Sequence, residues 1–283
     1  ADEAAERAFV KFNYTKDDLP YFRTIHSLCF RQLNLKRSDV MTRTHYQELG
    51  EMLGLEVDGG STLEEGQIFG MKTGDKLFFL ENLSRVKQIP LEEAYHKYND
   101  DEIQWFELER LSRALVAYKD KRKIIDYTDM LMKCLNVKSF PKLRILFVDE
   151  AQDLSSIQWN IINQIGKETE TMYVAGDDDQ AIYRWAGADV DQFIKLNGKS
   201  TVLEQSYRVP SSIWELATKL SLRIKSRIPK KFKPREEKGE VRYYMDPEDV
   251  DLTKDTWYLL ARNGYMLNQL ENICIKNGYP FTI

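Results

Sequence analysis

Short apolar runs in this chain end at polar clusters, which is typical of buried strands in an α/β protein. The clearest run covers residues 143–148 and stops abruptly at Asp149 and Glu150; further runs cover 171–175 and 201–204. The first run lacks polar alternation, so we expect a strand buried on both faces. Ligands bind at the carboxyl ends of strands in open α/β sheets, so the residues after each run are candidate site residues.

Residues 29–123 have a helical and charged pattern instead, without any polar cluster at the end of a strand-like run. One apolar stripe recurs at helical spacing, at Leu80, Leu83 and Val86. The Gly-Gly-Ser-Thr sequence at 59–62 marks a break between elements. We expect a mostly helical segment, with Trp105 and Phe106 in its core.

One helix start can be predicted before the strand that ends at Asp149, and another after it. Asp126 is expected to cap the helix that follows it, and Ser155 with Gln158 forms a capping box. The helix after Ser155 then has one apolar face, made of Ile157, Ile161, Ile162 and Ile165. Strand, acids and packed helix together predict one βα unit.

Composition describes an ordinary globular protein. At 283 residues, with 42% hydrophobic and 30% charged residues, the chain predicts two domains or one domain with a large insertion. No run of about 18 apolar residues or secretory signal pattern occurs, so we expect a cytoplasmic protein without a membrane partner. Cys29, Cys134 and Cys274 are widely spaced, which favours reduced thiols over disulfides or a zinc site.

The net charge of −4 argues against a strongly basic nucleic-acid footprint over the whole chain. It does not exclude single-stranded nucleic acid, because aromatic side chains can hold bases by stacking beside a modest basic groove.

The acids after the first run suit metal-assisted phosphate chemistry. Asp149 would offer oxygen to Mg²⁺, and Glu150 would act as a general base on an attacking water. Taken alone, the pair fits a strand end and turn equally well. A second cluster, 176–188, contains three consecutive acids, an amide and two aromatics, which make a poor core and predict a bound polar group.

Four segments in this order resemble the helicase family that includes UvrD, Rep and PcrA, the superfamily 1 ATP-dependent DNA translocases. They are Arg23-Thr24-Ile25-His26-Ser27, Asp149-Glu150-Ala151-Gln152-Asp153, residues 176–188 and residues 203–208. The resemblance implies an α/β fold: a RecA-like parallel sheet with a mostly helical inserted subdomain and the start of a second RecA-like domain.

The resemblance also implies domain boundaries. Residues 1–28 and 124–225 would form parts of the first RecA-like ATPase domain, 29–123 the inserted subdomain, and 226–283 a linker with part of the second RecA-like domain. The family's phosphate-binding loop would lie upstream of residue 1.

The family's phosphate-binding pattern, Gly-x-x-x-x-Gly-Lys-Ser/Thr, has one partial match in the chain. It is 197–201, where Phe193 occupies the first glycine position, and we interpret it as a turn. Without a phosphate-binding loop, residues 1–283 alone are expected not to hydrolyse ATP.

The cofactors implied are ATP and Mg²⁺. By resemblance, Asp149 would bind the metal, Glu150 would be the catalytic base, and Gln180 would lie near the γ-phosphate and its water. Tyr207 would stack on the adenine, and Arg208 would reach the γ-phosphate, where a permanently charged guanidinium suits the developing charge.

The partner implied is single-stranded DNA, with replication or repair proteins as further partners. Thr24 and His26 would contact DNA, and Tyr183 and Trp185 would stack on bases. Two positions depart from the family's usual pattern: Ile25 replaces an aromatic residue, and Ala186 replaces an arginine.

The function implied is that of an ATP-dependent helicase or translocase moving 3′ to 5′. Two alternatives stay open at this point. One is a non-catalytic nucleic-acid-binding or partner-docking module on the same fold, and the other is a helicase joined to a nuclease.

Overall fold

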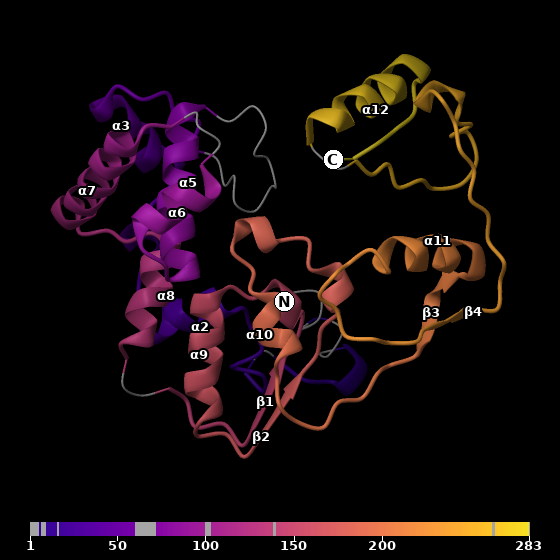
Figure 1. The fold of residues 1–283 in the computed structure, drawn as a ribbon, viewed down its shortest axis with the longest axis horizontal. Helices are drawn as coiled ribbons and strands as arrows, with labels where there is room; N and C mark the ends of the chain where they lie inside the picture. Colours follow the sequence, from indigo (N-terminus) through magenta and orange to yellow (C-terminus); the bar gives the residue numbers. More distant parts are fainter. Residues whose placement is uncertain are drawn as a thin grey trace. The chain divides into compact units, whose positions relative to one another are not determined.

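The structure is a computed structural model that describes Glu6 and residues 10–15, 17–59, 72–99, 103–137, 140–261 and 264–282. The chain divides into two compact units, one with the described residues up to Phe193 and one with those from Ile194 onward. Figure 1 traces the elements of each unit.

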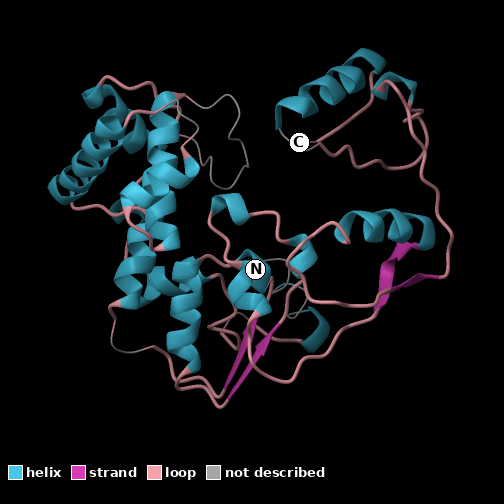
Figure 2. Ribbon diagram, in the orientation of Figure 1, coloured by secondary structure: helices cyan, strands magenta, loops and turns pink. Residues whose placement is uncertain are grey.

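The first unit contains a helical part built from residues that the hydrophobic pattern marks as helical (Figure 2). Its helices are α3 (Arg43–Leu53), α5 (Thr73–Lys87), α6 (Leu91–Tyr98) and α7 (Trp105–Arg122). Leu80 and Leu83 are buried as predicted. The predicted break at 59–62 lies, apart from Gly59, outside the described residues.

The prediction that Phe106 lies in the core of this helical part is wrong. Trp105 packs against the helical core, but Phe106 is 63% exposed. The two are adjacent at the start of α7, and neighbouring helical positions point in directions about 100° apart, so only one can face the core.

The first unit also contains a two-stranded parallel sheet, β1 (Ile145–Val148) and β2 (Thr171–Val174). One face packs on α9 (Ser156–Gly166), whose four predicted isoleucines are all buried. The capping box of Ser155 and Gln158 is confirmed. α2 (Ile25–Gln32) and α8 (Tyr127–Leu135) complete this core with α9.

The prediction that β1 is buried on both faces is wrong for the described residues. Phe147 is 74% exposed and stacks on its register partner Tyr173, with ring centroids 5.0 Å apart. Leu146 and Val148 point to the opposite face, where α9 packs, so only one face of the strand is covered.

The first unit also contains short 3₁₀ helices and one short α-helix. They are the 3₁₀ helices η1 (Arg37–Asp39), η2 (Ala151–Asp153), η3 (Asp178–Gln180) and η4 (Arg184–Ala186), with helix α10 (Val190–Ile194) at the boundary.

The second unit contains β3 (Gln205–Pro210) and β4 (Lys233–Arg235), which pair in parallel, and α11 (Ser211–Ser221), η5 (Pro247–Asp249) and α12 (Gly264–Asn277). The strand predicted at 201–204 starts instead at Gln205, because β4 pairs with the chain only from that residue. Tyr207 and Arg208 therefore lie within the strand and not after it.

The described residues thus form a mixed helix and strand structure with small parallel sheets, compatible with the α/β class. Within the described part of the chain, no helix combines the length and apolar character needed to cross a membrane.

Candidate functional site

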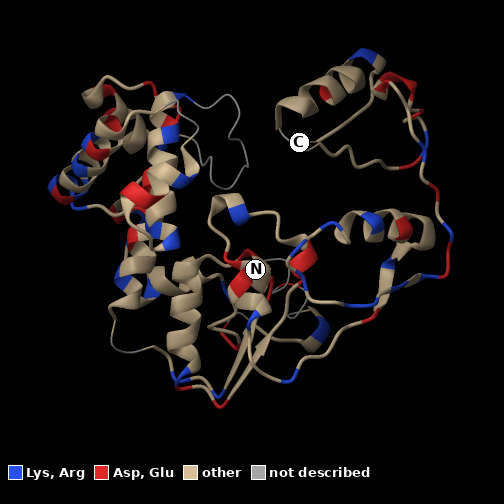
Figure 3. Cartoon of the chain, viewed as in Figure 1, with Lys and Arg blue, Asp and Glu red and all other residues tan. Residues whose placement is uncertain are grey.

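The carboxyl ends of β1 and β2 bring the first two polar clusters together, because parallel neighbouring strands end at the same edge. Acidic residues follow both strands and appear in red in Figure 3. Asp149 and Glu150 are both exposed, and the Asp149 carboxylate accepts a hydrogen bond from the Glu150 amide at 3.0 Å. Glu150 has a left-handed backbone with φ of 51°, an uncommon conformation for a residue other than glycine, which turns the chain sharply into η2.

Gln152 joins the two strand ends from a buried position. Its Nε2 donates to Glu150 Oε2 at 2.8 Å, and its Oε1 accepts from the Asp177 amide at 2.9 Å. A Cβ atom at Gly176 would lie only 2.6 Å from that Oε1, so the close approach requires glycine.

Gln180 belongs to the same network. Its Nε2 donates to Asp177 Oδ2 at 2.7 Å, while Asp177 Oδ1 accepts from the Asp179 amide and caps η3. Glu150 and Gln180, both predicted catalytic residues, are thereby connected through Gln152 and Asp177. Sequence reasoning missed Gln152, because no local pattern distinguishes a buried glutamine from an exposed one.

The carboxylates suit a magnesium ion by their chemistry. Mg²⁺ keeps several waters and takes only one or two protein carboxylates beside substrate phosphates, and exposed Asp149 can provide one. No group of three or more His, Cys, Asp or Glu able to enclose a metal occurs among the described residues. Nearby, burial and the Glu150 charge raise the pKa of Asp153.

The second half of the cluster, residues 183–188, is held against helix α5. Trp185 is half-buried and stacks on Phe79, with ring centroids 6.0 Å apart and planes 17° apart. Gly187 has φ of +109°, and a Cβ there would lie 2.6 Å from Val86 Cγ1. Tyr183 is more exposed and accepts from the Ala188 amide through its carbonyl.

Arg184, the cation beside Trp185, makes a long contact with Asp191, at 3.5 Å. This exposed pair contributes little to stability.

Thr24 and His26 lie at the start of α2. Thr24 is the N-cap, and its hydroxyl oxygen accepts from the Ser27 amide at 3.2 Å. His26 meets the ring of Tyr127 edge to face, with centroids 5.7 Å apart. Tyr127 is 59% exposed, and no sequence pattern identifies it as a site residue.

Tyr207 and Arg208 belong to the second unit. Both are exposed, Tyr207 to 86%. The Arg208 amide bonds to Ser206 Oγ at 3.4 Å.

Asp126 caps α8 as predicted, accepting from the Asp129 amide at 2.7 Å, and it also anchors a buried ion cluster. Arg85 reaches Asp126 at 2.8 Å and Asp129 at 3.1 Å. Lys119 reaches the same two acids at 2.7 and 2.6 Å, and Glu81 pairs with Arg85 at 2.8 Å. Burial alone would raise the pKa of Asp126, but Arg85 and Lys119 outweigh it and lower that pKa to about 2.

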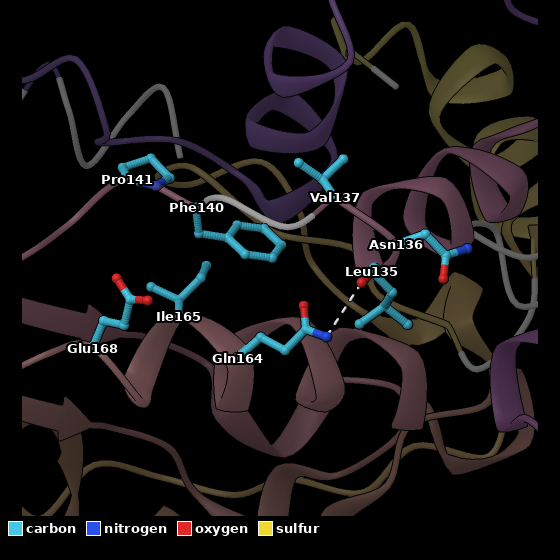
Figure 4. A pocket seen from close by; sticks show the side chains of 8 residues that line it. All are labelled: Leu135, Asn136, Val137, Phe140, Pro141, Gln164, Ile165 and Glu168. Atoms are coloured by element: carbon cyan, nitrogen blue, oxygen red, sulfur yellow. Dashed lines mark hydrogen bonds between the residues drawn. The ribbon is translucent and has the colours of Figure 1, made fainter.

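A pocket of about 360 Å³ lies between the ends of α8 and α9, and Figure 4 shows its lining. Gln164 donates across it to the Leu135 carbonyl at 3.2 Å. The lining residues include Glu168 but no lysine or arginine, so they do not suit a phosphate group.

Comparison of the sequence with known proteins identifies its family. Three similar proteins are ATP-dependent DNA helicases by name. PcrA of Leuconostoc citreum is 29% identical over 161 residues, which are 50% of this chain and 22% of the relative. PcrA of Staphylococcus epidermidis is 23% identical over 299 residues, 93% of this chain and 40% of the relative. Rep of Buchnera aphidicola is 29% identical over 118 residues, 37% of this chain and 18% of the relative.

The matched region therefore spans at most 40% of the length of these relatives. The family model described as the UvrD/REP helicase N-terminal domain matches residues 1–201 of the 283. The chain belongs to the UvrD/REP helicase N-terminal domain family.

Proposed function

We propose that the protein is an ATP-dependent DNA helicase or translocase that moves 3′ to 5′ along single-stranded DNA. One observation carries this proposal: Gln152 and Asp177 link Glu150 to Gln180, and the chain continues from Gln180 directly into the turn that holds Trp185. Under this proposal, the group near ATP and the group near DNA would belong to one short segment. The relatives named as ATP-dependent DNA helicases support the same function.

The proposed chemistry is hydrolysis of the γ-phosphate. Asp149 would hold Mg²⁺, which would neutralise charge on the phosphates. Glu150 accepts a proton from the attacking water, and Gln180 orients that water. Tyr207 stacks on the adenine, and Arg208 stabilises the charge that develops on the phosphate oxygens.

The proposed architecture is RecA-like. Residues 1–28 and 124–225 belong to the first ATPase domain, 29–123 to the inserted helical subdomain, and 226–283 to the linker and second domain. The parallel β1–β2 pair supports the first assignment, and the helices α3 and α5 to α7 support the second.

The proposed DNA contacts lie on two segments of the first unit. Tyr183 and Trp185 stack on bases, while Thr24 and His26 contact the strand from the start of α2. Exposed Tyr127 lies against His26 and is a further aromatic at this position. A displacement of Gln180 on hydrolysis would be passed along η3 and η4 to Trp185, which couples chemistry to movement.

The test is DNA-stimulated ATP hydrolysis by the protein in its full natural length. Glu150→Gln keeps an oxygen that can accept from Gln152 but removes the base, so we expect turnover to fall at least about 100-fold. The control is Glu168→Gln, at an exposed acid two residues after the end of α9, and it should leave turnover unchanged. Equal turnover in the wild type and Glu150→Gln would exclude the assigned base.

Direction is tested separately, by displacement of streptavidin from biotinylated single strands. Movement 3′ to 5′ predicts faster displacement from the 5′ end, and faster displacement from the 3′ end would reverse the assignment. Residues 1–283 alone should not hydrolyse ATP measurably, because they contain no Gly-x-x-x-x-Gly-Lys-Ser/Thr sequence. Hydrolysis by these residues that Glu150→Gln abolishes would contradict that expectation.

A further inference from the structure

Trp185 does not stand free of the protein, because the ring of Phe79 covers part of it. The two rings are nearly parallel, with planes 17° apart and centroids 6.0 Å apart, which is an offset stack. Phe79 comes from α5, far from Trp185 in sequence, and both residues are half-buried.

The contact belongs to a longer line along α5. Phe79, Leu83 and Val86 are spaced by four and three positions and so share one helical face. Gly187 approaches Val86 and Leu83, since a Cβ there would lie 2.6 Å from Val86 Cγ1 and 3.7 Å from Leu83 Cδ1. The segment from Trp185 to Gly187 therefore packs against two successive helical turns of α5.

α5 is itself fixed from another side. Glu81 and Arg85 join the buried ion cluster with Asp126 and Asp129, at distances of 2.8 to 3.1 Å. Asn82 accepts a hydrogen bond from Thr128 at 2.5 Å. The helix is thus bonded to the start of α8 and cannot shift under the Trp185 turn without breaking buried ionic contacts.

We propose that Phe79 is a positioning residue for nucleic-acid binding. It occupies one face of the Trp185 indole and fixes the plane of the ring, so that a nucleobase stacks on the opposite face only. This inference rests on the proposed function. It extends that function to α5, a helix that contains none of the family-like motifs. It also limits Trp185 to stacking on one base, because Phe79 covers the other face of the indole ring.

A fixed ring binds better than a mobile one. An indole that must be ordered on binding loses rotamer freedom, and that loss is subtracted from the stacking free energy. Replacing Phe79 by leucine keeps the site apolar but removes the flat surface, so it should weaken single-strand binding by about five- to tenfold. No phosphate contact is lost, so the salt dependence of binding should not change.

The experiment measures fluorescence anisotropy of a labelled oligo-dT across a salt series. The variants are Phe79→Leu, Phe79→Tyr, Trp185→Ala and the double variant Phe79→Leu with Trp185→Ala. Phe106→Leu, an equal change at a 63% exposed phenylalanine of α7, is the matched control. Circular dichroism and urea unfolding establish that each variant is folded at the temperature of the titration.

The proposal predicts weaker binding by Phe79→Leu, near wild-type binding by Phe79→Tyr, and no change in Phe106→Leu. It also predicts that Phe79→Leu has little further effect once Trp185 is alanine, because the two residues act through one contact. A purely structural role would lower stability without this coupling.

The outcomes distinguish the inference from the function on which it rests. If the wild type binds oligo-dT and Phe79→Leu binds equally well, or if the two substitutions are fully additive, Phe79 does not position Trp185. Should Phe79→Leu fail to fold, loss of binding in a folded Phe79→Tyr variant would overturn the proposal, and retained binding with the Trp185 effect intact would support it. If the wild type does not bind at all, the proposed function fails and the inference falls with it.

Discussion

The buried side-chain amide of Gln152 accepts a hydrogen bond from the backbone amide of Asp177, 2.9 Å away, and so ties the end of β1 to the end of β2. Its other end donates to Glu150, one of the two exposed acids of this edge. The separation between Glu150 and the loop that contains Gln180 is therefore set by one fully hydrogen-bonded side chain and not by exposed, mobile groups.

Loss of this bridge should destabilise the first unit. Gln152→Ala leaves the Asp177 amide without its partner in a partly buried position, so we expect the free energy of unfolding to fall by about 1–3 kcal/mol. Gln152→Glu should cost at least as much, because it removes the donor to Glu150 and adds a like charge beside it. Urea unfolding followed by circular dichroism measures both.

Gln180→Ala provides the matched control for that series. Gln180 also bonds to Asp177, but it is exposed, so its removal should change the free energy of unfolding by no more than about 0.5 kcal/mol. If Gln152→Ala and Gln180→Ala lowered the free energy of unfolding equally, the buried Gln152 bridge would not stabilise the unit more than an exposed hydrogen bond does.

Gly187 should not tolerate a side chain. Alanine would need a φ of +109° and would place Cβ 2.6 Å from Val86 Cγ1, so Gly187→Ala should lower the free energy of unfolding by about 2 kcal/mol or more. Thermal unfolding of the purified variant measures the loss, and adding Val86→Ala should recover only the part due to the clash.

Gly166 provides a control for the loss of stability expected when Gly187 is replaced by alanine. Gly166 ends α9, has no left-handed φ, and a Cβ there would find Met172 Sδ at an ordinary 3.5 Å. Gly166→Ala should therefore change stability by less than about 1 kcal/mol, in the stabilising direction. A loss at Gly166 as large as at Gly187 would contradict the account of the turn.

The ion cluster around Asp126 predicts a pH dependence. Asn at this position can still cap α8 but loses the charge that faces Arg85 and Lys119, so Asp126→Asn should cost on the order of 3 kcal/mol at neutral pH. The folded pKa of Asp126, about 2, lies below its ordinary value of 3.8. Its stabilising contribution is thus complete above about pH 5 and is lost as the pH falls through 3.8 toward 2.

The measurement is the difference in free energy of unfolding between the wild type and Asp126→Asn at several pH values. We expect this difference to be constant from pH 7 to about 5 and to shrink between about pH 4 and 2. Burial raises the pKa of Glu81 in the same cluster, so Glu81 acts in the opposite direction, and it is present in both proteins. A difference that grows on acidification would show that the charge of Asp126 is not stabilising.

The sequence predicts those parts of the structure that are encoded locally. The strands at β1 and β2, the isoleucine face of α9 and the caps of α8 and α9 each depend on residues close together in the chain. Periodicity and capping chemistry suffice for such elements.

The remaining features depend on residues far apart in sequence. Nothing near Phe79 indicates that its partner is Trp185, and nothing near Gln152 indicates that it will be buried between two strand ends. Likewise, an unbroken apolar run predicts a strand in β1, but whether one or both faces are covered depends on what packs there, so the exposed Phe147 could not be predicted.

The most direct test of whether the turn after β2 binds single-stranded DNA compares oligo-dT binding by the wild type and by Trp185→Ala across a salt series. Stacking of one base on Trp185 predicts a loss on the order of 1–3 kcal/mol in binding free energy, with a nearly unchanged salt slope. Equal binding by the two proteins, or no binding by either, would contradict the assignment of Trp185 as the stacking residue.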